Sequence, residues 1–92
     1  LPLVSQIDPH LEQSVRIGEL MGELSEDILH RRDTISYYQR LRGIREYHKE
    51  LPLPATRAEF ESRACLFNLA NELELLIAKQ NEQDERLERA AG

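Results

Sequence analysis

The sequence predicts an all-α protein, a small helical bundle of three helices or a long two-helix hairpin, associating with a second chain. Apolar residues recur at intervals of three and four over most of the chain, and no segment alternates with the two-residue period of a strand. The four prolines stand only at positions 2, 9, 52 and 54, which leaves long stretches free of helix breakers. A chain of 92 residues with 40% hydrophobic content suits one domain, residues 1–92, rather than a disordered segment. The helices are expected at about residues 9–31, 33–51 and 56–89, with a fraying tail at 82–92.

The first predicted helix has a clear start and an open end. Asp8 is a suitable N-cap, and Pro9 follows at the first helical position, where its missing N–H costs nothing. A break is possible at Ser25 or at Asp33, but neither site carries glycine or proline. One continuous helix from Pro9 to about Glu50 therefore remains an alternative to two helices.

The second predicted helix ends at the segment Leu51-Pro52-Leu53-Pro54. Proline removes a backbone donor and pushes the preceding residue towards extended geometry, so a helix stops there. The apolar seam of this helix is spaced by four and three residues, and it consists of Tyr37, Leu41, Ile44, His48 and Leu51. We interpret His48, because of its place on the seam, as a partly buried packing residue rather than a metal ligand or a base.

The third predicted helix begins at Thr56. The segment from Thr56 to Glu59 matches a capping box, in which the hydroxyl accepts from a first-turn N–H and the glutamate reaches back towards the cap. The end of this helix, residues 82–92, is mostly polar and is expected to fray.

This last helix carries two apolar strips. A helix at the edge of a small monomer needs only one apolar face, so the second strip predicts contact with another chain, either a second copy or another helical protein. The broad strip consists of Leu66, Leu69, Ala70, Leu73, Leu76 and Ile77. The second strip includes three residues that we predict to bind a partner: Phe60, Ala64 and Phe67.

A basic stripe crosses the middle of the chain, although the net charge is −5. At 100° per residue its members fall on one side of a helix, and they are Arg31, Tyr38, Arg42, Arg45 and Lys49. One interpretation is a partner-binding strip formed by Tyr38, Arg42, Arg45 and Lys49 for an acidic or anionic partner. The alternative is that the stripe packs against the acidic helices of the same chain, which supply carboxylates on both sides.

The sequence contains no pattern of catalytic, cofactor-binding or metal-ligating residues. The single cysteine, Cys65, cannot form an internal disulfide, and His10, His30 and His48 stand at no metal-ligand spacing. No apolar run of about 18 residues and no signal peptide at Leu1 is present, so neither a membrane nor export from the cell is expected. The predicted location is intracellular, cytoplasmic or nuclear, and the negative net charge disfavours nucleic acid as a direct ligand.

One stretch resembles a known family. Residues 37–49, Tyr-Tyr-Gln-Arg-Leu-Arg-Gly-Ile-Arg-Glu-Tyr-His-Lys, followed by the proline segment to residue 54, resemble the helical N-terminal segment of the sixty-kilodalton subunit of the splicing-factor-three-a complex. The resemblance implies a helical segment that binds other proteins of a larger assembly. The predicted function is accordingly a protein–protein interaction or scaffold module that presents helical surfaces.

The alternative function is a small all-helical enzyme, similar to the helical chorismate mutases, that binds an anionic substrate through an arginine cluster. That chemistry needs several cations to hold substrate carboxylates and a carboxamide or carboxylate near the ether oxygen. The residues available for it are Arg16, Arg31, Arg32, Arg42 and Gln80. Their spacings depart from the pattern of that family.

Overall fold

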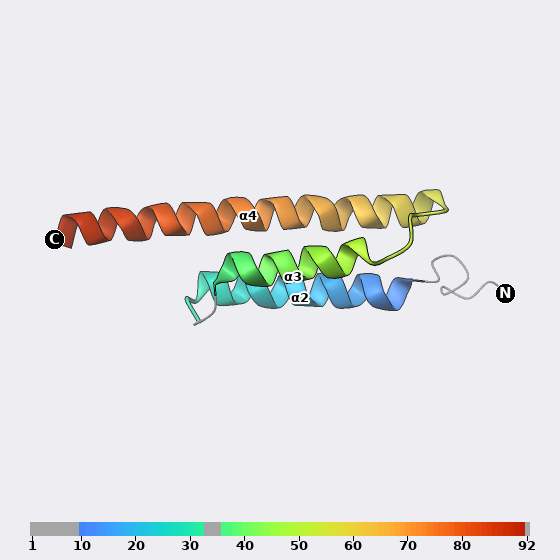
Figure 1. Cartoon of the computed structure of the whole chain (residues 1–92), viewed down its shortest axis with the longest axis horizontal. Helices are drawn as coiled ribbons and strands as arrows, with labels where there is room; N and C mark the ends of the chain where they lie inside the picture. Colours follow the sequence, from blue (N-terminus) through green and yellow to red (C-terminus); the bar gives the residue numbers. More distant parts are fainter. Residues whose placement is uncertain (1–9, 33–35, 92) are drawn as a thin grey trace.

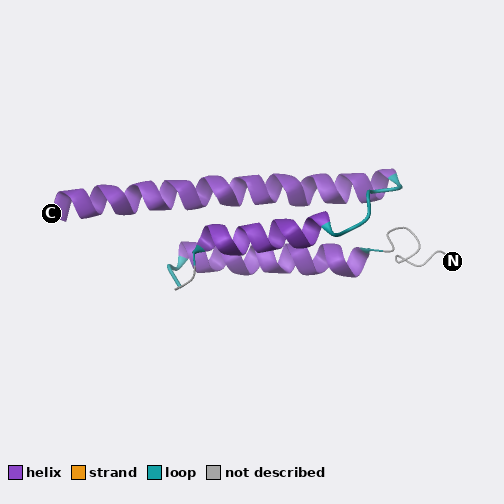
Figure 2. Ribbon diagram, in the orientation of Figure 1, coloured by secondary structure: helices purple, strands orange, loops and turns teal. Residues whose placement is uncertain are grey.

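Residues 10–32 and 36–91 contain three helices that run side by side. The structure is a computed structural model that describes residues 10–32 and 36–91. Its helices are α2 (Leu11–Leu29), α3 (Tyr37–Lys49) and α4 (Arg57–Ala91), and Figure 1 shows α2 and α3 as an antiparallel hairpin along one part of α4. All regular structure among the described residues is helical (Figure 2). The predicted fold class, a small all-α bundle of three helices, is therefore confirmed.

The core lies where the three helices meet, and its residues follow helical spacing on each of them. Removing such side chains from water is worth about 1.5–3 kcal/mol for each large aliphatic residue, which makes this contact the main force holding the bundle together. The buried apolar residues are Ile17, Met21, Leu24 and Ile28 of α2, Leu41 and Ile44 of α3, and Ala70, Leu73 and Ile77 of α4.

The first helix ends in a left-handed turn at Arg31, whose φ is 54°. The N–H of Arg31 donates to the carbonyl of Ile28 at 3.3 Å, and the N–H of Arg32 donates to that of Asp27 at 2.9 Å. These paired bonds form a Schellman motif, which usually places glycine at the left-handed position. The helix therefore ends without a glycine at the left-handed position. The alternative of one continuous helix from Pro9 to about Glu50 is wrong, because α2 and α3 are separate helices.

Polar contacts tie the end of α2 to the start of α3. The Asp27 carboxylate accepts from Nη1 of Arg40 at 2.7 Å and from Nε of Arg32 at 3.4 Å. These two hydrogen bonds, that from Arg40 first, hold the pKa of the Asp27 carboxyl below its usual range despite an opposing effect of burial. The connection between the helices is thus stabilised by charge as well as by the apolar core.

A capping box starts α4. The N–H of Glu59 donates to Oγ1 of Thr56 at 3.2 Å, as the sequence predicts. The Glu59 carboxylate reaches back to the N–H of Ala55 at 2.9 Å, one residue before the expected partner. This second bond ties the proline-containing segment to α4, and Glu59 is buried beneath it.

Other details differ from the sequence-based expectations. α4 continues to Ala91, two residues beyond the expected end at residue 89, and fraying of its polar end stays a prediction. Leu69, assigned to the broad apolar strip, is 36% exposed because the α2–α3 hairpin does not cover its side of α4. Asp8, Pro9 and Asp33, on which the expected cap and one expected break depend, lie outside the described residues.

Candidate functional site

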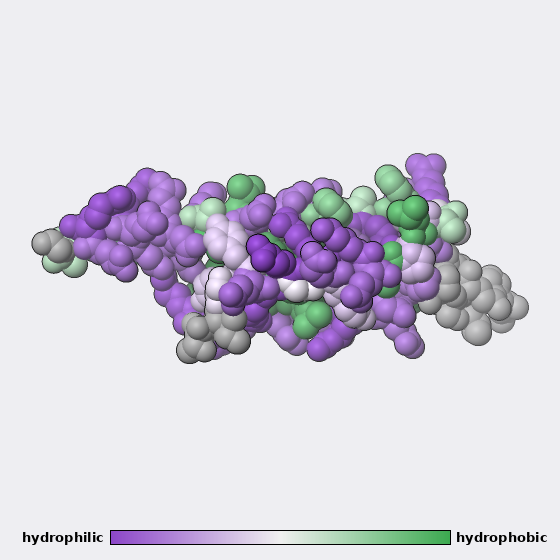
Figure 3. Space-filling model, in the orientation of Figure 1, coloured by the Kyte–Doolittle hydropathy of each residue, from purple (hydrophilic) through white to green (hydrophobic). Residues whose placement is uncertain are grey.

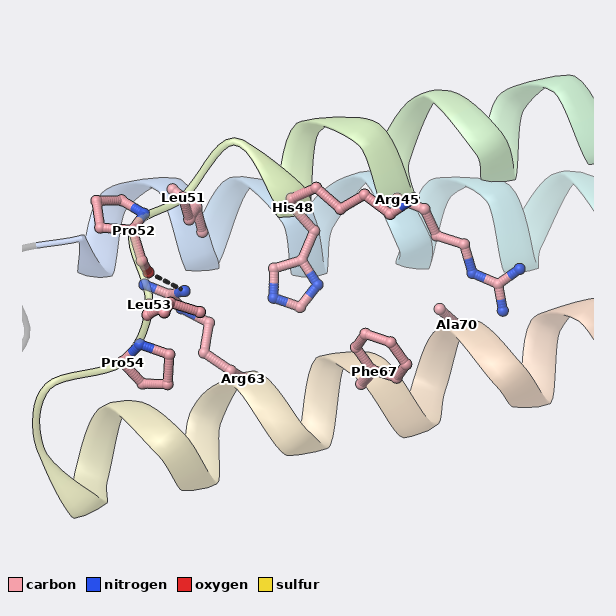
Figure 4. Close-up of a pocket in the computed structure, with 10 residues that line it drawn as sticks. Arg45, His48, Leu51, Pro52, Leu53, Pro54, Arg63, Phe67 and Ala70 are labelled. Carbon is pink, nitrogen blue, oxygen red and sulfur yellow. Dashed lines mark hydrogen bonds between the residues drawn. The ribbon is translucent and has the colours of Figure 1, made fainter.

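A hollow of about 320 Å³ lies between the end of α3, the proline segment and the first half of α4 (Figure 4). The two prolines force the chain to leave α3 in an extended path, which passes over the second turn of α4 instead of packing as helix. Apolar side chains make up most of the wall, and basic groups stand among them. The residues that line the hollow are Arg45, His48, Lys49, Leu51, Pro52, Leu53, Pro54, Arg63, Phe67 and Ala70.

Arg63 is the central charged group of this hollow. The residue is only 8% exposed, and Nη1 donates to the carbonyl of Pro52 at 2.8 Å (Figure 4). Its other two nitrogens, Nε and Nη2, are buried without any hydrogen-bond partner. No carboxylate of the described residues forms an ion pair with this guanidinium. Buried cations are normally paired, so Arg63 lacks the anion that such a site calls for.

His48 and Phe67 face each other across the hollow, one from α3 and one from α4 (Figure 4). Their ring centroids are 6.2 Å apart, with the ring planes inclined by 55°. Burial lowers the pKa of the His48 imidazole below its ordinary value, and the nearby positive charge of Arg63 lowers it further. The positive charge of Arg63 therefore disfavours a second cation at His48.

The basic stripe predicted from the sequence is divided by the structure. Nη1 of Arg45 donates to Glu74 at 3.1 Å and Nη2 donates to Asn71 at 2.9 Å, so its guanidinium is directed along α4 and away from the hollow (Figure 4). Lys49 lies 3.6 Å from Glu46 on its own helix. Tyr38 and Arg42 are exposed on α3. These residues line a second, polar hollow, and their role in binding a partner stays a prediction.

The second apolar strip adjoins the hollow. Phe60 and Phe67 are 63% and 61% exposed, and Ala64 is partly buried between them. Together with Arg63 they line a further apolar depression, which shares Pro54, Arg63 and Phe67 with the first hollow. The strip is therefore continuous with the Arg63 hollow, and its partner-binding role remains a prediction.

Arg63 itself was not found from the sequence. Its position on the helical wheel says little, because a lone arginine in a helix is usually solvated. The available signal was the distance along the chain between the proline segment and position 63. An extended segment that leads into a helix capped at Thr56 can pass over the second turn of that helix. The side chain at position 63 lies there, under Pro52.

The five residues considered for chorismate-mutase-like chemistry do not converge. Arg32 and Arg42 line different surface hollows. Gln80 donates to the carbonyl of Ile28 at 2.9 Å and packs as a structural residue. The remaining arginines form ion pairs, Arg16 with Glu19 at 3.4 Å and Arg31 with Asp84 at 2.7 Å. This arrangement offers no pocket in which several arginines could hold one substrate.

Two further properties of the described residues bear on the class of protein. No group of three or more histidine, cysteine, aspartate or glutamate side chains in residues 10–32 and 36–91 is placed to hold a metal ion. Within these same ranges, no helix has the length and apolar character needed to cross a membrane. The described residues form a helical bundle with an apolar hollow that is lined in part by a buried cation without an ion-pair partner.

Comparison with known proteins identifies the family. Residues 1–81 match the family described as "Putative aromatic acid exporter C-terminal domain", so the chain belongs to that family. It is also 40% identical over 74 residues to a Bacillus subtilis (strain 168) protein named "Uncharacterized protein YqjA". That match covers 80% of this chain and 23% of the relative, so the chain spans about a quarter of the curated relative's length. No solved structure matches the chain.

The family membership overturns several sequence-based predictions. The resemblance of residues 37–54 to the splicing-factor-three-a subunit is wrong, because the family match covers this segment together with most of the chain. A short amphipathic helix rich in tyrosine and arginine had produced the likeness. The predicted scaffold function and the enzyme alternative are wrong as well, since the family is one of exporter domains.

The predicted partners and location are corrected on the same ground. A homodimer or another helical protein without a membrane, and an intracellular, cytoplasmic or nuclear location, do not fit an exporter family, because export takes place at a membrane. Those predictions depended on the lack of an apolar run in the 92 residues, and these residues correspond to only 23% of the length of the curated relative.

Proposed function

We propose that this chain is a helical domain of a membrane protein that exports aromatic acids. The observation that carries the proposal is the family match over residues 1–81. The relative's greater length supports it, because a chain that spans 23% of a relative leaves room for a transport unit elsewhere in a full-length protein.

The surface of the bundle favours a position in water beside such a unit. Hydrophilic side chains cover most of the face seen in Figure 3, including the end of α4 that projects beyond the hairpin. Exposed ion pairs occur along the helices, such as Arg57 with Glu61 at 3.1 Å and Arg86 with Glu82 at 2.6 Å. Charged side chains are costly in lipid, so these helices suit the aqueous side of the membrane surface.

An efflux assay tests this function. A Bacillus subtilis strain lacking the relative would receive the intact relative, the relative without the segment that matches this chain, or the relative with that segment replaced by this chain. Cells preloaded with radiolabelled benzoate are then followed for release of the label. We expect deletion of the segment to slow efflux and the replacement to restore it.

The amount of each protein in the membrane fraction, measured by immunoblot, is the control for assembly. Efflux of labelled phenylalanine, an aromatic amino acid with a different charge, tests whether the effect concerns aromatic acids. Two results would contradict the proposal: equal benzoate efflux with and without the intact relative, or unchanged efflux when the segment is deleted from a protein present at the normal level.

A further inference from the structure

We propose that the hollow between α3 and α4 binds an aromatic carboxylic acid, with Arg63 holding the carboxylate and Phe67 packing against the ring. This inference rests on the proposed role in aromatic-acid export and deepens it, because it assigns a substrate-binding site to this domain. The family match names the class of compound, and the residues of the hollow supply the chemistry that would recognise it.

The carboxylate has an obvious partner in Arg63. Its Nη1 is occupied by the carbonyl of Pro52, whereas Nε and Nη2 are unpartnered and belong to the same planar group. Two parallel N–H groups of a guanidinium match the two oxygens of a carboxylate, and hydrogen bonds of this kind are among the strongest in proteins. A bound carboxylate would supply both the missing acceptors and the missing counter-charge.

The ring of the acid fits the remaining wall. Leu51, Pro52 and Phe67 present apolar surface on opposite sides of the hollow, and the His48 ring lies opposite Phe67. Aromatic rings prefer offset or edge-to-face contacts at centroid distances of about 4.5–7 Å, and the His48–Phe67 pair already follows such a geometry. The volume of about 320 Å³ is at the small end of ligand sites, which suits an acid with one ring.

Access to the arginine requires a local movement. Nε and Nη2 are shielded from solvent, so a carboxylate reaches them after the segment above Arg63 moves aside or the guanidinium turns. Leu53 in this segment is 90% exposed and contributes little packing that would resist the movement. The segment is attached to α3 at one end and to the α4 cap at the other, so binding at Arg63 acts directly on the connection between these helices.

Titration calorimetry on this 92-residue chain tests the site with benzoate as the probe. Benzyl alcohol provides the ring without the carboxylate, and acetate provides the carboxylate without the ring. We expect benzoate to bind at least tenfold more tightly than either. Equal affinity for benzoate and acetate would overturn the proposed ring site, and equal affinity for benzoate and benzyl alcohol would overturn the proposed carboxylate site.

Two variants locate the binding, and one serves as a matched control. Arg63→Gln removes the charge and should weaken benzoate binding by roughly ten- to hundredfold, the range for hydrogen bonds to charged groups. Arg57→Gln changes an exposed arginine of the same helix outside the hollow and should leave the affinity unaltered. If the Arg63→Gln protein bound benzoate as tightly as the Arg57→Gln protein does, the proposal would be overturned.

A second variant keeps the test valid if Arg63→Gln does not fold, as judged by circular dichroism. Phe67→Ala alters a side chain that is already 61% exposed, so the bundle should persist while benzoate binding weakens. Unchanged benzoate affinity of a folded Phe67→Ala protein would overturn the ring contact. The calorimetry tests the binding site and the efflux assay tests the proposed function. A negative calorimetry result leaves the proposed function standing, because a domain without this site can still be required for export.

Discussion

At the scale of single residues, the hollow is defined by a positive charge that the protein leaves unbalanced. Arg63 is buried with one hydrogen bond, and its effect reaches His48 across the space between α3 and α4. Burial and the cation both disfavour the protonated imidazole, and burial has the larger effect. The two causes can be separated by experiment, because only one of them depends on residue 63.

Arg63→Gln should raise the pKa of His48 towards the ordinary value of 6.5 while leaving it below that value, since burial persists. A titration followed by NMR of the imidazole carbon-bound protons measures this directly. Arg57→Gln, on the exposed side of α4, should leave the titration unaltered. A His48 pKa that stays constant or falls in Arg63→Gln would show that the guanidinium charge does not act on the imidazole.

Acid should destabilise the fold in two windows. The folded-state pKa of His48 lies below 6.5, so the unfolded chain binds the proton first and stability falls as the pH drops from about 6.5 through the folded value. The folded-state pKa of Asp27 lies below 3.8, so its contribution is present above that pH and is lost as the pH falls through the lowered value.

Urea unfolding at a series of pH values would resolve these windows. His48→Gln should reduce the loss of stability just below pH 6.5 without affecting the loss at lower pH. Asp27→Asn should reduce the loss at lower pH without affecting the one near pH 6.5. The Asp27 carboxylate is held by Arg40 and Arg32, so its variant should also be less stable at neutral pH. A stability that rises as the pH drops from 6.5 in the wild-type chain would contradict the sign assigned to His48.

At the scale of elements, the start of α4 depends on the reciprocal bonds of Thr56 and Glu59. Thr56→Ala removes the hydroxyl acceptor for a first-turn N–H and should lower the free energy of unfolding by about 1 kcal/mol. Thr56→Ser keeps an acceptor at that position and should retain most of the stability. Equal denaturation midpoints for the alanine variant and the wild type would mean that the cap does not stabilise α4.

The packing of α3 on α4 contains one charge contact that a matched pair of variants can measure. Arg45 bonds to Glu74 and Asn71 of α4, whereas Arg42 is exposed on the same helix. Arg45→Glu places like charges together and should destabilise the bundle by about 0.2–1 kcal/mol, less at high salt. Arg42→Glu should change stability little. Equal losses for the two variants would show that the Arg45 contact is not special.

At the scale of the whole molecule, the bundle follows from the helical spacing of apolar residues and from the proline pair that ends α3. The buried apolar residues of α2 recur at intervals of four, three and four, and Pro52 with Pro54 separates α3 from α4 as expected. The end of α2 was less accessible to prediction, because Arg31 adopts a left-handed conformation that sequence reasoning expects of glycine. Local patterns therefore predicted the elements better than the turn between the first two.

The candidate site could be predicted only in part. Phe67 was named for its apolar strip and His48 for its place on the seam, and both line the hollow. Arg63 was missed because its importance arises from the chain that covers it, and helical periodicity cannot report burial under a neighbouring loop. The family could not be predicted from a short motif either, because the match to the exporter family extends over residues 1–81 as a whole.

A crystal structure of the chain soaked with 4-bromobenzoate tests the central claim most directly, because the bromine atom can be located by its anomalous scattering. The account predicts bromine density in the hollow beside Phe67 and Leu51. It also predicts that the carboxylate accepts hydrogen bonds from Nε and Nη2 of Arg63, at about 2.7–2.9 Å. A bound acid located elsewhere on the bundle, or an Arg63 whose two free nitrogens stay unpartnered with the acid present, would contradict it.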